Sequence, residues 1–276
     1  MPEPVPSLLL PAEQQPLFGR RIVITAPRSY ALRLAAALLD LGGLPLFMPT
    51  IATTLLDDYT ALDHCLVQRA SFDWIVCTSR NGIEALLHRC AHLGLPPTAL
   101  QACRLAAIGQ DAERLATLGL RVDLLPAEPS PQGIVAALAQ LPASPGQAIL
   151  VPAPLVEGMP EPDIIPSFVA GLQRIGMHVT RVPAYRTRLV DRAHYPIELE
   201  LIRRGAVDAL ALSSAGEVAG LLAMIDDPGD YRQCAICCFG PYTAANARRL
   251  GLTPAVVADD FSSFAGFARA IAAYLQ

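Results

Sequence analysis

Hydroxyl-bearing residues recur where a mostly apolar, strand-like run gives way to a helical pattern. Ser213 and Ser214 follow residues 207–212, and Thr78 and Ser79 follow residues 72–77. The first turn of a helix presents unpaired backbone N–H groups and a partial positive charge, which favour carboxylate or phosphate groups. We therefore predict that anions bind at these strand-to-helix corners. The hydroxyl residues at such corners are Thr25, Thr78, Ser79, Ser130, Ser213, Ser214, Thr243 and Ser263.

Helix capping is the alternative interpretation of the same residues. Ser and Thr are preferred at N-cap positions because their side-chain oxygens accept hydrogen bonds from first-turn N–H groups. At any single corner this structural role is favoured. The repetition at several corners indicates that some of the hydroxyls face a ligand.

Tyr185 is a further candidate for chemistry. It lies in the extended segment 182–187, which should lead from one domain to another. A phenol at such a place could donate a hydrogen bond or a proton to a ligand. The alternative is an aromatic ring packed at a domain hinge, and spacing alone favours that alternative.

Strand-like and helix-like runs alternate along the chain, and the same order restarts after a turn-rich break at residues 142–146. The halves also match locally, because Ser130-x-x-Gly133 corresponds to Ser263-x-x-Gly266. Strands that alternate with helices form parallel sheets covered on both faces, with ligands beyond the carboxyl ends of the strands. We therefore predict an α/β fold with two doubly wound parallel-sheet domains and an interdomain cleft.

Several common chemistries lack their sequence signatures. The chain has no G-x-G-x-x-G after a strand, no G-x-x-x-x-G-K-[ST] and no G-x-S-x-G, which argues against nucleotide binding and a hydrolase elbow. His88 and His92 lack the glutamate of H-E-x-x-H, and Cys234-x-x-Cys237 lacks a second C-x-x-C. We expect no metal site. The seven cysteines are interpreted as buried thiols in a reducing compartment.

Composition limits the class of protein further. Hydrophobic residues make up 53% of the 276 residues and charged residues 17%, which indicates a mostly packed chain. A net charge of −4 without blocks of like charge gives no support for nucleic-acid or membrane binding. Residues 1–18 are proline-rich without a basic start, and we interpret them as a flexible leader. Together these features predict a soluble, cytoplasmic protein.

The order and spacing of the motifs resemble the uroporphyrinogen-III synthase family over about residues 19–275. The segments that carry the resemblance are residues 72–85, 182–187, 239–244, 250–252 and 254–258, and the Ser263-x-x-Gly266 helix start.

The resemblance implies two α/β domains joined by a two-stranded linker. One domain would be continuous, at residues 54–178, and the other would combine residues 19–43 with 189–276. Residues 44–53 and 179–188 would form the linkers. The prolines at positions 45, 49 and 183 agree with this division, because proline is disfavoured in central strands.

The implied reaction is the closure of the linear tetrapyrrole hydroxymethylbilane to uroporphyrinogen III in heme, chlorophyll or cobalamin biosynthesis. The last pyrrole ring is inverted and water is lost, through an azafulvene and a spiro intermediate, without a cofactor. Such an enzyme, a cyclising hydro-lyase, must hold a flexible substrate in one conformation and assist departure of its hydroxyl. Eight substrate carboxylates would suit several helix starts. We also expect a monomer that contacts hydroxymethylbilane synthase transiently.

Site residues follow from the resemblance position by position. Tyr185 matches a tyrosine proposed to assist loss of the hydroxyl. Asp111 falls where a hydroxyl is common, and Ala26 and Ala215 also depart from the family pattern, so these residues should affect affinity more than fold. The residues implied in substrate binding are Thr25, Arg28, Thr78, Ser79, Arg80, Gly109, Gln110, Ser213, Ser214, Gly240, Pro241, Tyr242 and Thr243.

Two other classes of protein share this architecture. A non-catalytic sensor of tetrapyrroles or small anions would keep the same two-domain cleft, and an attached DNA-binding or receiver domain would favour it. A periplasmic-type binding protein would also have two α/β lobes and a hinge, but it would need a signal sequence.

Overall fold

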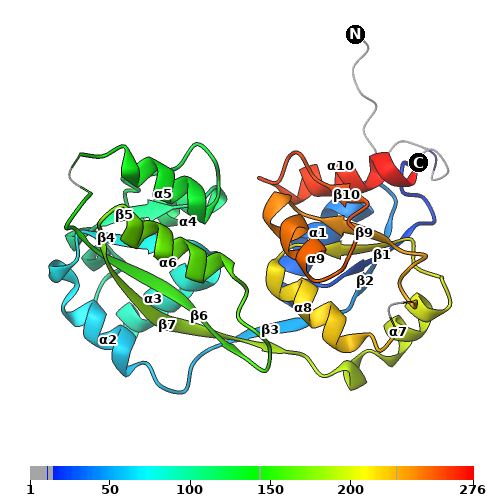
Figure 1. Ribbon diagram of the computed structural model, residues 1–276, viewed down its shortest axis with the longest axis horizontal. Coiled ribbons are helices and arrows are strands. Elements are labelled where there is room, and N and C mark those ends of the chain that lie inside the picture. Colours follow the sequence, from blue (N-terminus) through cyan, green and yellow to red (C-terminus); the bar gives the residue numbers. More distant parts are fainter. Residues whose placement is uncertain (1–10, 12–14, 143, 228) are drawn as a thin grey trace, which may run out of the picture. The chain divides into compact units, whose positions relative to one another are not determined.

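Two sheets, each assembled from strands far apart in the chain, form the cores of two units (Figure 1). The computed structural model describes residues 11, 15–142, 144–227 and 229–276. Unit 1 comprises Met1–Ala52, Gly158–Pro160 and Arg188–Gln276, and unit 2 comprises Thr53–Glu157 and Glu161–Thr187.

The sheet of unit 1 has the strand order β10-β9-β8-β1-β2, and its neighbouring strands pair in parallel. The order changes direction between β1 and β8. This is the topological switch point, the place where open α/β sheets bind ligands. The strands are β1 (Arg21–Ile24), β2 (Leu44–Phe47), β8 (Ala209–Leu212), β9 (Ala235–Cys238) and β10 (Val256–Val257).

Alternate residues of these strands face opposite layers of helices. On one face Ile22 and Ile24 pack with α1 and α10, and on the other Leu210 and Leu212 pack with α7, α8 and α9. Unit 1 is therefore doubly wound. Its helices are α1 (Arg28–Leu39), α7 (Pro196–Arg203), α8 (Ala215–Met224), α9 (Pro241–Arg249) and α10 (Phe264–Leu275), with a 3-10 turn at Arg192–His194.

The sheet of unit 2 has the order β3-β7-β6-β4-β5, in which β4 pairs in parallel with both β5 and β6. Leu124 makes an isolated parallel bridge to Ala106 next to β5, outside the named strands. The Asp123 side chain accepts the Leu105 N–H at 2.9 Å and so takes the place of a ladder carbonyl. The strands are β3 (Ile51–Thr54), β4 (Trp74–Cys77), β5 (Arg104–Ala107), β6 (Ala148–Glu157) and β7 (His178–Leu189).

Unit 2 is also covered on both faces (Figure 1). Ile75 and Cys77 face α2, α3 and α4, whereas Trp74 and Val76 face α5 and α6. The α/β class with two doubly wound sheets, rich in parallel pairs, is thus confirmed. The helices are α2 (Thr60–Val67), α3 (Arg80–His92), α4 (Gln110–Thr117), α5 (Pro131–Ala139) and α6 (Ile164–Arg174), with 3-10 turns at Arg69–Ser71 and Pro97–Ala102.

Two segments differ from our expectation. Leu17, which we placed in the leader, is fully buried and its N–H donates to the Leu41 carbonyl at 2.8 Å; residues 1–10 and 12–14 lie outside the described residues. Leu44–Phe47, which we placed in a linker, is strand β2, paired with β1. Pro45 is compatible with this place because β2 is an edge strand, where a missing N–H is tolerated.

Candidate functional site

The corner between β4 and α3 brings Ser79 and Tyr185 together. Ser79 is the N-cap of α3, and its Oγ accepts the Gly82 N–H at 3.2 Å. The same Oγ lies 3.0 Å from the Tyr185 hydroxyl, so the two groups share a hydrogen bond. Capping and a second polar contact therefore coexist at this corner. Thr78 precedes them and is half-buried.

Tyr185 belongs to β7 and is 9% exposed. Burial raises the pKa of its phenol above the usual value, the hydrogen bond with Ser79 opposes that rise, and the Asp111 charge adds to it. The phenol is therefore protonated at neutral pH. It can act as a hydrogen-bond or proton donor.

An ion pair lies beside this corner. The Arg80 Nε is 3.3 Å from the Asp111 Oδ1, and the two side chains are 33% and 18% exposed. A lone carboxylate at Asp111 would repel an anionic substrate, but the Arg80 guanidinium compensates its charge. Gly109 precedes α4 with φ +52°, a conformation that glycine adopts easily. The side chain of Gln110 lies outside the described residues.

The corresponding corner of unit 1 holds a buried carboxyl group, that of Glu217. Its Oε2 accepts the Ser213 N–H at 2.8 Å, and its Oε1 accepts the Ser213 and Ser214 hydroxyls at 2.6 and 3.0 Å. Ser214 is the N-cap of α8. We did not select Glu217 from the sequence. The pattern Ser214-x-x-Glu217 is a capping-box signature, and it would have identified this residue.

Thr25 meets the same carboxyl group from the neighbouring strand. It follows β1, is fully buried, and its Oγ1 lies 2.8 Å from the Glu217 Oε2 and 2.9 Å from the Ala211 carbonyl oxygen. The hydroxyls of Thr25, Ser213 and Ser214 thus contact a carboxyl group of the protein itself. Arg28 is exposed at the first residue of α1.

The last predicted corner precedes α9. Gly240 is the N-cap and Pro241 the first helical residue, where its missing N–H costs nothing. A Cβ on Gly240 would lie 2.9 Å from the Cβ of Phe261, so only glycine fits without a shift. Thr243 donates weakly to the Ser213 carbonyl at 3.4 Å, which joins this corner to that of α8. Tyr242 is half-buried.

Ser130 and Ser263 cap α5 and α10, as the repeat predicts. Each Oγ accepts the N–H three residues later, at 2.9 and 3.0 Å, and each lies near a carboxylate of the protein, that of Glu128 or Asp260. At these two corners capping accounts for the sequence pattern.

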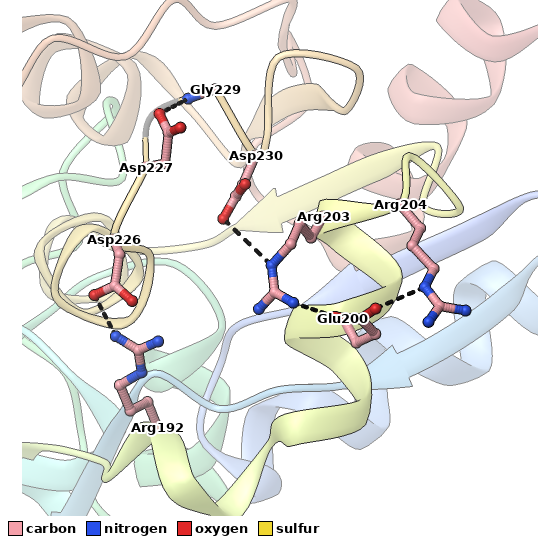
Figure 2. Close-up of polar contacts among 8 residues, drawn as sticks. All are labelled: Arg192, Glu200, Arg203, Arg204, Asp226, Asp227, Gly229 and Asp230. Atoms are coloured by element: carbon pink, nitrogen blue, oxygen red, sulfur yellow. Dashed lines mark hydrogen bonds and ion pairs between the residues drawn. The ribbon is translucent and has the colours of Figure 1, made fainter.

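A separate cavity of about 240 Å³ lies among charged residues of unit 1, and Figure 2 shows the polar contacts that several of these residues make. Arg192 pairs with Asp226, and Arg203 pairs with Glu200 and lies 4.0 Å from Asp230. The cavity is formed where α7 and α8 end, which in a parallel sheet is the amino-terminal edge. It is therefore at the edge opposite the corners. Its lining residues are Arg192, Leu199, Ile202, Arg203, Met224, Ile225, Asp226, Asp227 and Asp230.

The cysteines are all free and buried. Burial raises the pKa of Cys77 to about 12 and that of Cys234 to about 11, so these thiols are protonated. Within the described ranges, no group of three or more His, Cys, Asp or Glu residues could hold a metal ion. In the same part of the chain, no helix combines the length and apolarity needed to cross a membrane.

The two units define a class of protein, a two-domain α/β protein with hydroxyl and guanidinium donors at the strand-to-helix corners. The chain belongs to the uroporphyrinogen-III synthase family, whose model, described as "Uroporphyrinogen-III synthase HemD", matches residues 33–268.

Individual relatives agree with this assignment. The uroporphyrinogen-III synthase of Synechococcus elongatus is 26% identical over 244 residues, which is 86% of this chain and 89% of that protein. The porphyrin biosynthesis protein HemD of Ruminiclostridium josui is 24% identical over 240 residues, 87% of this chain; the match spans 46% of that longer protein, about half its length.

Solved structures of the family share the fold. A mutant uroporphyrinogen III synthase of the extremely thermophilic bacterium Thermus thermophilus aligns with a TM-score of 0.62 and 24% identity, over 91% of this chain and 98% of that one.

Proposed function

We propose that this protein is a uroporphyrinogen-III synthase, a lyase that converts hydroxymethylbilane to uroporphyrinogen III with loss of water. The observation that carries the proposal is the family match over residues 33–268. It is supported by the relative from Synechococcus elongatus that bears this name and is matched over most of its length.

The Tyr185 corner suits the first chemical step. The phenol is neutral and has a hydrogen-bond partner at 3.0 Å, so it can give its proton to a departing hydroxyl, which leaves as water. The substrate keeps the electrophilic carbon that then closes the ring. Arg80, the first residue of α3 and the neighbour of Ser79 in the chain, is proposed to exchange its ion pair with Asp111 for a substrate carboxylate. In this proposal Tyr185 is the catalytic residue.

The other predicted residues are proposed to bind and orient the substrate. In unit 2 they surround the start of α3 and α4, and in unit 1 they surround the starts of α1, α8 and α9, where N–H groups favour carboxylates. The members are Thr25, Arg28, Thr78, Ser79, Arg80, Gly109, Gln110, Ser213, Ser214, Gly240, Pro241, Tyr242 and Thr243.

We further propose a monomer in the cytoplasm that meets hydroxymethylbilane synthase transiently. The seven free, buried cysteines support a reducing compartment, where such thiols persist. A non-catalytic sensor is not favoured, because the relatives named for an activity are named as a synthase.

The decisive experiment supplies hydroxymethylbilane made enzymatically in situ and separates the porphyrin isomers after oxidation. Spontaneous closure gives isomer I, so the proposal predicts an excess of isomer III that grows with protein concentration. Isomer I alone, at the rate of the protein-free control, would refute the synthase. If the protein then still bound the product, that result would support the sensor.

A further inference from the structure

Glu217 is a buried acid that the proposed chemistry does not use. Its side chain is 2% exposed and lies after β8, next to β1, at the switch point of the unit 1 sheet. Ligands of doubly wound folds usually occupy this place. Here the buried carboxyl group of Glu217 is hydrogen-bonded to hydroxyls from both corners.

One arrangement of the hydrogen atoms satisfies both contacts of the Thr25 hydroxyl. Thr25 Oγ1 lies within hydrogen-bond distance of two acceptors, the Glu217 Oε2 and the Ala211 carbonyl oxygen, but it has only one proton. If Glu217 carries a proton on Oε2, it donates to Thr25, which donates onward to Ala211. Every group in this chain then has its partner. Burial favours the same neutral form, because it raises the pKa of the carboxyl group despite the bonds from Ser213, Thr25 and Ser214.

The carboxyl group therefore joins two corners that are more than 180 residues apart. Ser213 and Ser214 bind it from the start of α8, and Thr25 binds it from the end of β1. Thr50 provides a second connection between the two corners. Its N–H donates to the Thr25 carbonyl at 3.0 Å, and its hydroxyl donates to the Glu217 carbonyl at 3.1 Å. Contacts from both sides fix the relative position of the corners.

We infer that Glu217 is a positioning residue: its carboxyl group ties the Ser213–Ser214 corner to Thr25, so that the two corners of the switch point form one pre-organised substrate-binding surface. The consequence for catalysis rests on the proposed function. The hydrogen bonds that connect the two corners through Glu217, called the tie below, do not depend on the proposed function.

Amide hydrogen exchange tests the tie without any substrate. In Glu217→Ala, the amides of Ser213 and Thr25 should both exchange at least roughly fivefold faster, because each loses the support of one hydrogen bond. Glu217→Gln should restore most of the protection, since its amide can accept from Ser213 and donate to the serine hydroxyls. Faster exchange confined to residues 213–217, with Thr25 unchanged, would overturn the inference.

Thr25→Val approaches the same contact from the other strand and serves if Glu217→Ala does not fold. Loss of the Thr25 hydroxyl should speed exchange at Ser213, on the neighbouring corner, although Ser213 is not mutated. Unchanged exchange at Ser213 would overturn the inference as well. Asp260→Ala is the matched control, because Asp260 binds a capping serine of the same unit. It should affect only residues near 260–266.

Kinetics test the consequence. Glu217→Ala should raise the KM for hydroxymethylbilane roughly fivefold with a smaller change in kcat, since binding groups lose their alignment. Glu217→Gln and Asp260→Ala should keep the wild-type KM. A fall in kcat at constant KM would indicate only fewer folded molecules and would refute the positioning role. If the wild type makes no isomer III, the proposed function fails, and the exchange result still decides whether the tie exists.

Discussion

The strand-to-helix corners at the starts of α3 and α8 have the same N-cap arrangement but differ in the acidic group that the capping serine contacts. Ser79 and Ser214 are the N-caps, and each accepts the N–H of the residue three positions later. That residue is Gly82 in one corner and Glu217 in the other. Because Gly82 has no side chain, Ser79 is left to bond the phenol of Tyr185 from β7, whereas Ser214 bonds the carboxyl group of its own helix.

We call the corner of Ser79 and Tyr185 the acting corner, because its phenol is proposed to donate a proton to the substrate. We call the corner of Ser214 and Glu217 the closed corner, because its carboxyl group is hydrogen-bonded to the protein itself. Both hydroxyls meet a buried acidic group, a phenol in unit 2 and a carboxyl group in unit 1. The phenol shares its hydrogen bond with Ser79, which directly precedes Arg80 at the start of α3, while the carboxyl group is enclosed by Thr25, Ser213 and Ser214. We therefore expect chemistry at the first corner and positioning at the second.

Removing the phenol should have the largest effect. Tyr185→Phe is expected to lower kcat on the order of 100-fold, because a general acid contributes at least that much. The fold should persist, since the ring still fills its site and only one hydrogen bond is lost, about 1 kcal/mol. The measurement is the rate of isomer III formation, with circular dichroism as a check on folding.

Tyr59→Phe is the matched control for Tyr185→Phe. Tyr59 is 8% exposed in the same unit and its hydroxyl accepts the Leu56 N–H at 3.2 Å, so it is a buried tyrosine without a role in the proposed site. It should keep the wild-type rate. Equal rates for both variants would remove Tyr185 from the mechanism.

Converting the first corner into the second should be the next most damaging change. Gly82→Glu supplies the carboxyl group that Glu217 supplies in unit 1, where it would compete with Tyr185 for Ser79 and add a like charge beside an anionic substrate. A Cβ at Gly82 meets only ordinary contacts, at 3.6 Å from the Pro152 carbonyl and from the Ser79 Oγ. We expect kcat/KM to fall roughly tenfold, measured in the same isomer assay.

Gly82→Ala controls for the loss of glycine. It adds the Cβ without a carboxyl group and should stabilise the protein by about 0.5–1 kcal/mol, since alanine is the better helix former. Its activity should stay within about twofold of wild type. If the alanine variant were as slow as the glutamate variant, the space at Gly82 rather than the competing carboxyl group would explain the loss.

Local patterns in the sequence predicted most of the corners. The strand-to-helix alternation gave the two doubly wound units, and the repeat Ser130-x-x-Gly133 with Ser263-x-x-Gly266 predicted two caps that the structure contains. These features depend on contacts within a few residues. Local composition therefore encodes them.

Contacts between distant strands were not predictable in the same way. Tyr185 and Ser79 are 106 positions apart, and Thr25 and Glu217 are 192 positions apart. Each sheet also combines strands from both halves of the repeat, β1 and β2 with β8 to β10, and β6 and β7 with β4 and β5. A period in the sequence cannot decide which half supplies a neighbour. β2 was mistaken for a linker for a different reason: the resemblance implied a linker there and Pro45 argued against a central strand, whereas β2 is an edge strand paired with β1.

The buried carboxyl group of Glu217 leads to a prediction about how the stability of the protein depends on pH. Burial raises the folded pKa of Glu217, so between the ordinary carboxyl pKa and the raised value the native state holds a proton that the unfolded state has lost. The stability contributed by Glu217 is therefore complete at low pH and lost as the pH rises through the folded pKa. Urea unfolding should show wild type losing stability relative to Glu217→Gln over this window. The thiol of Cys238, whose pKa is raised to about 12, does not titrate in this pH window and does not contribute to the change.

Asp260→Asn provides a control of opposite sign. Hydrogen bonds from Ser262 and Ser263 lower the pKa of Asp260, so its contribution is present above the ordinary carboxyl pKa and lost as the pH falls through the lowered one. Relative to this variant, wild type should gain stability as the pH rises. If wild type also gained stability relative to Glu217→Gln as the pH rises, Glu217 would be ionised in the native state.

The smallest effect is expected where a corner has only a cap. Ser263 Oγ accepts the Gly266 N–H at 3.0 Å and contacts Asp260, and no residue of our proposed site meets it in the described part of the chain. Ser263→Ala should cost about 1 kcal/mol of unfolding free energy, a fall of roughly 3 °C in Tm, and leave kcat and KM unchanged. Ser79→Ala should lose a similar amount of stability but also slow the reaction, because Tyr185 loses its partner. If both variants changed only stability, the first corner would be a cap like the others, and the distinction between an acting and a closed corner would disappear.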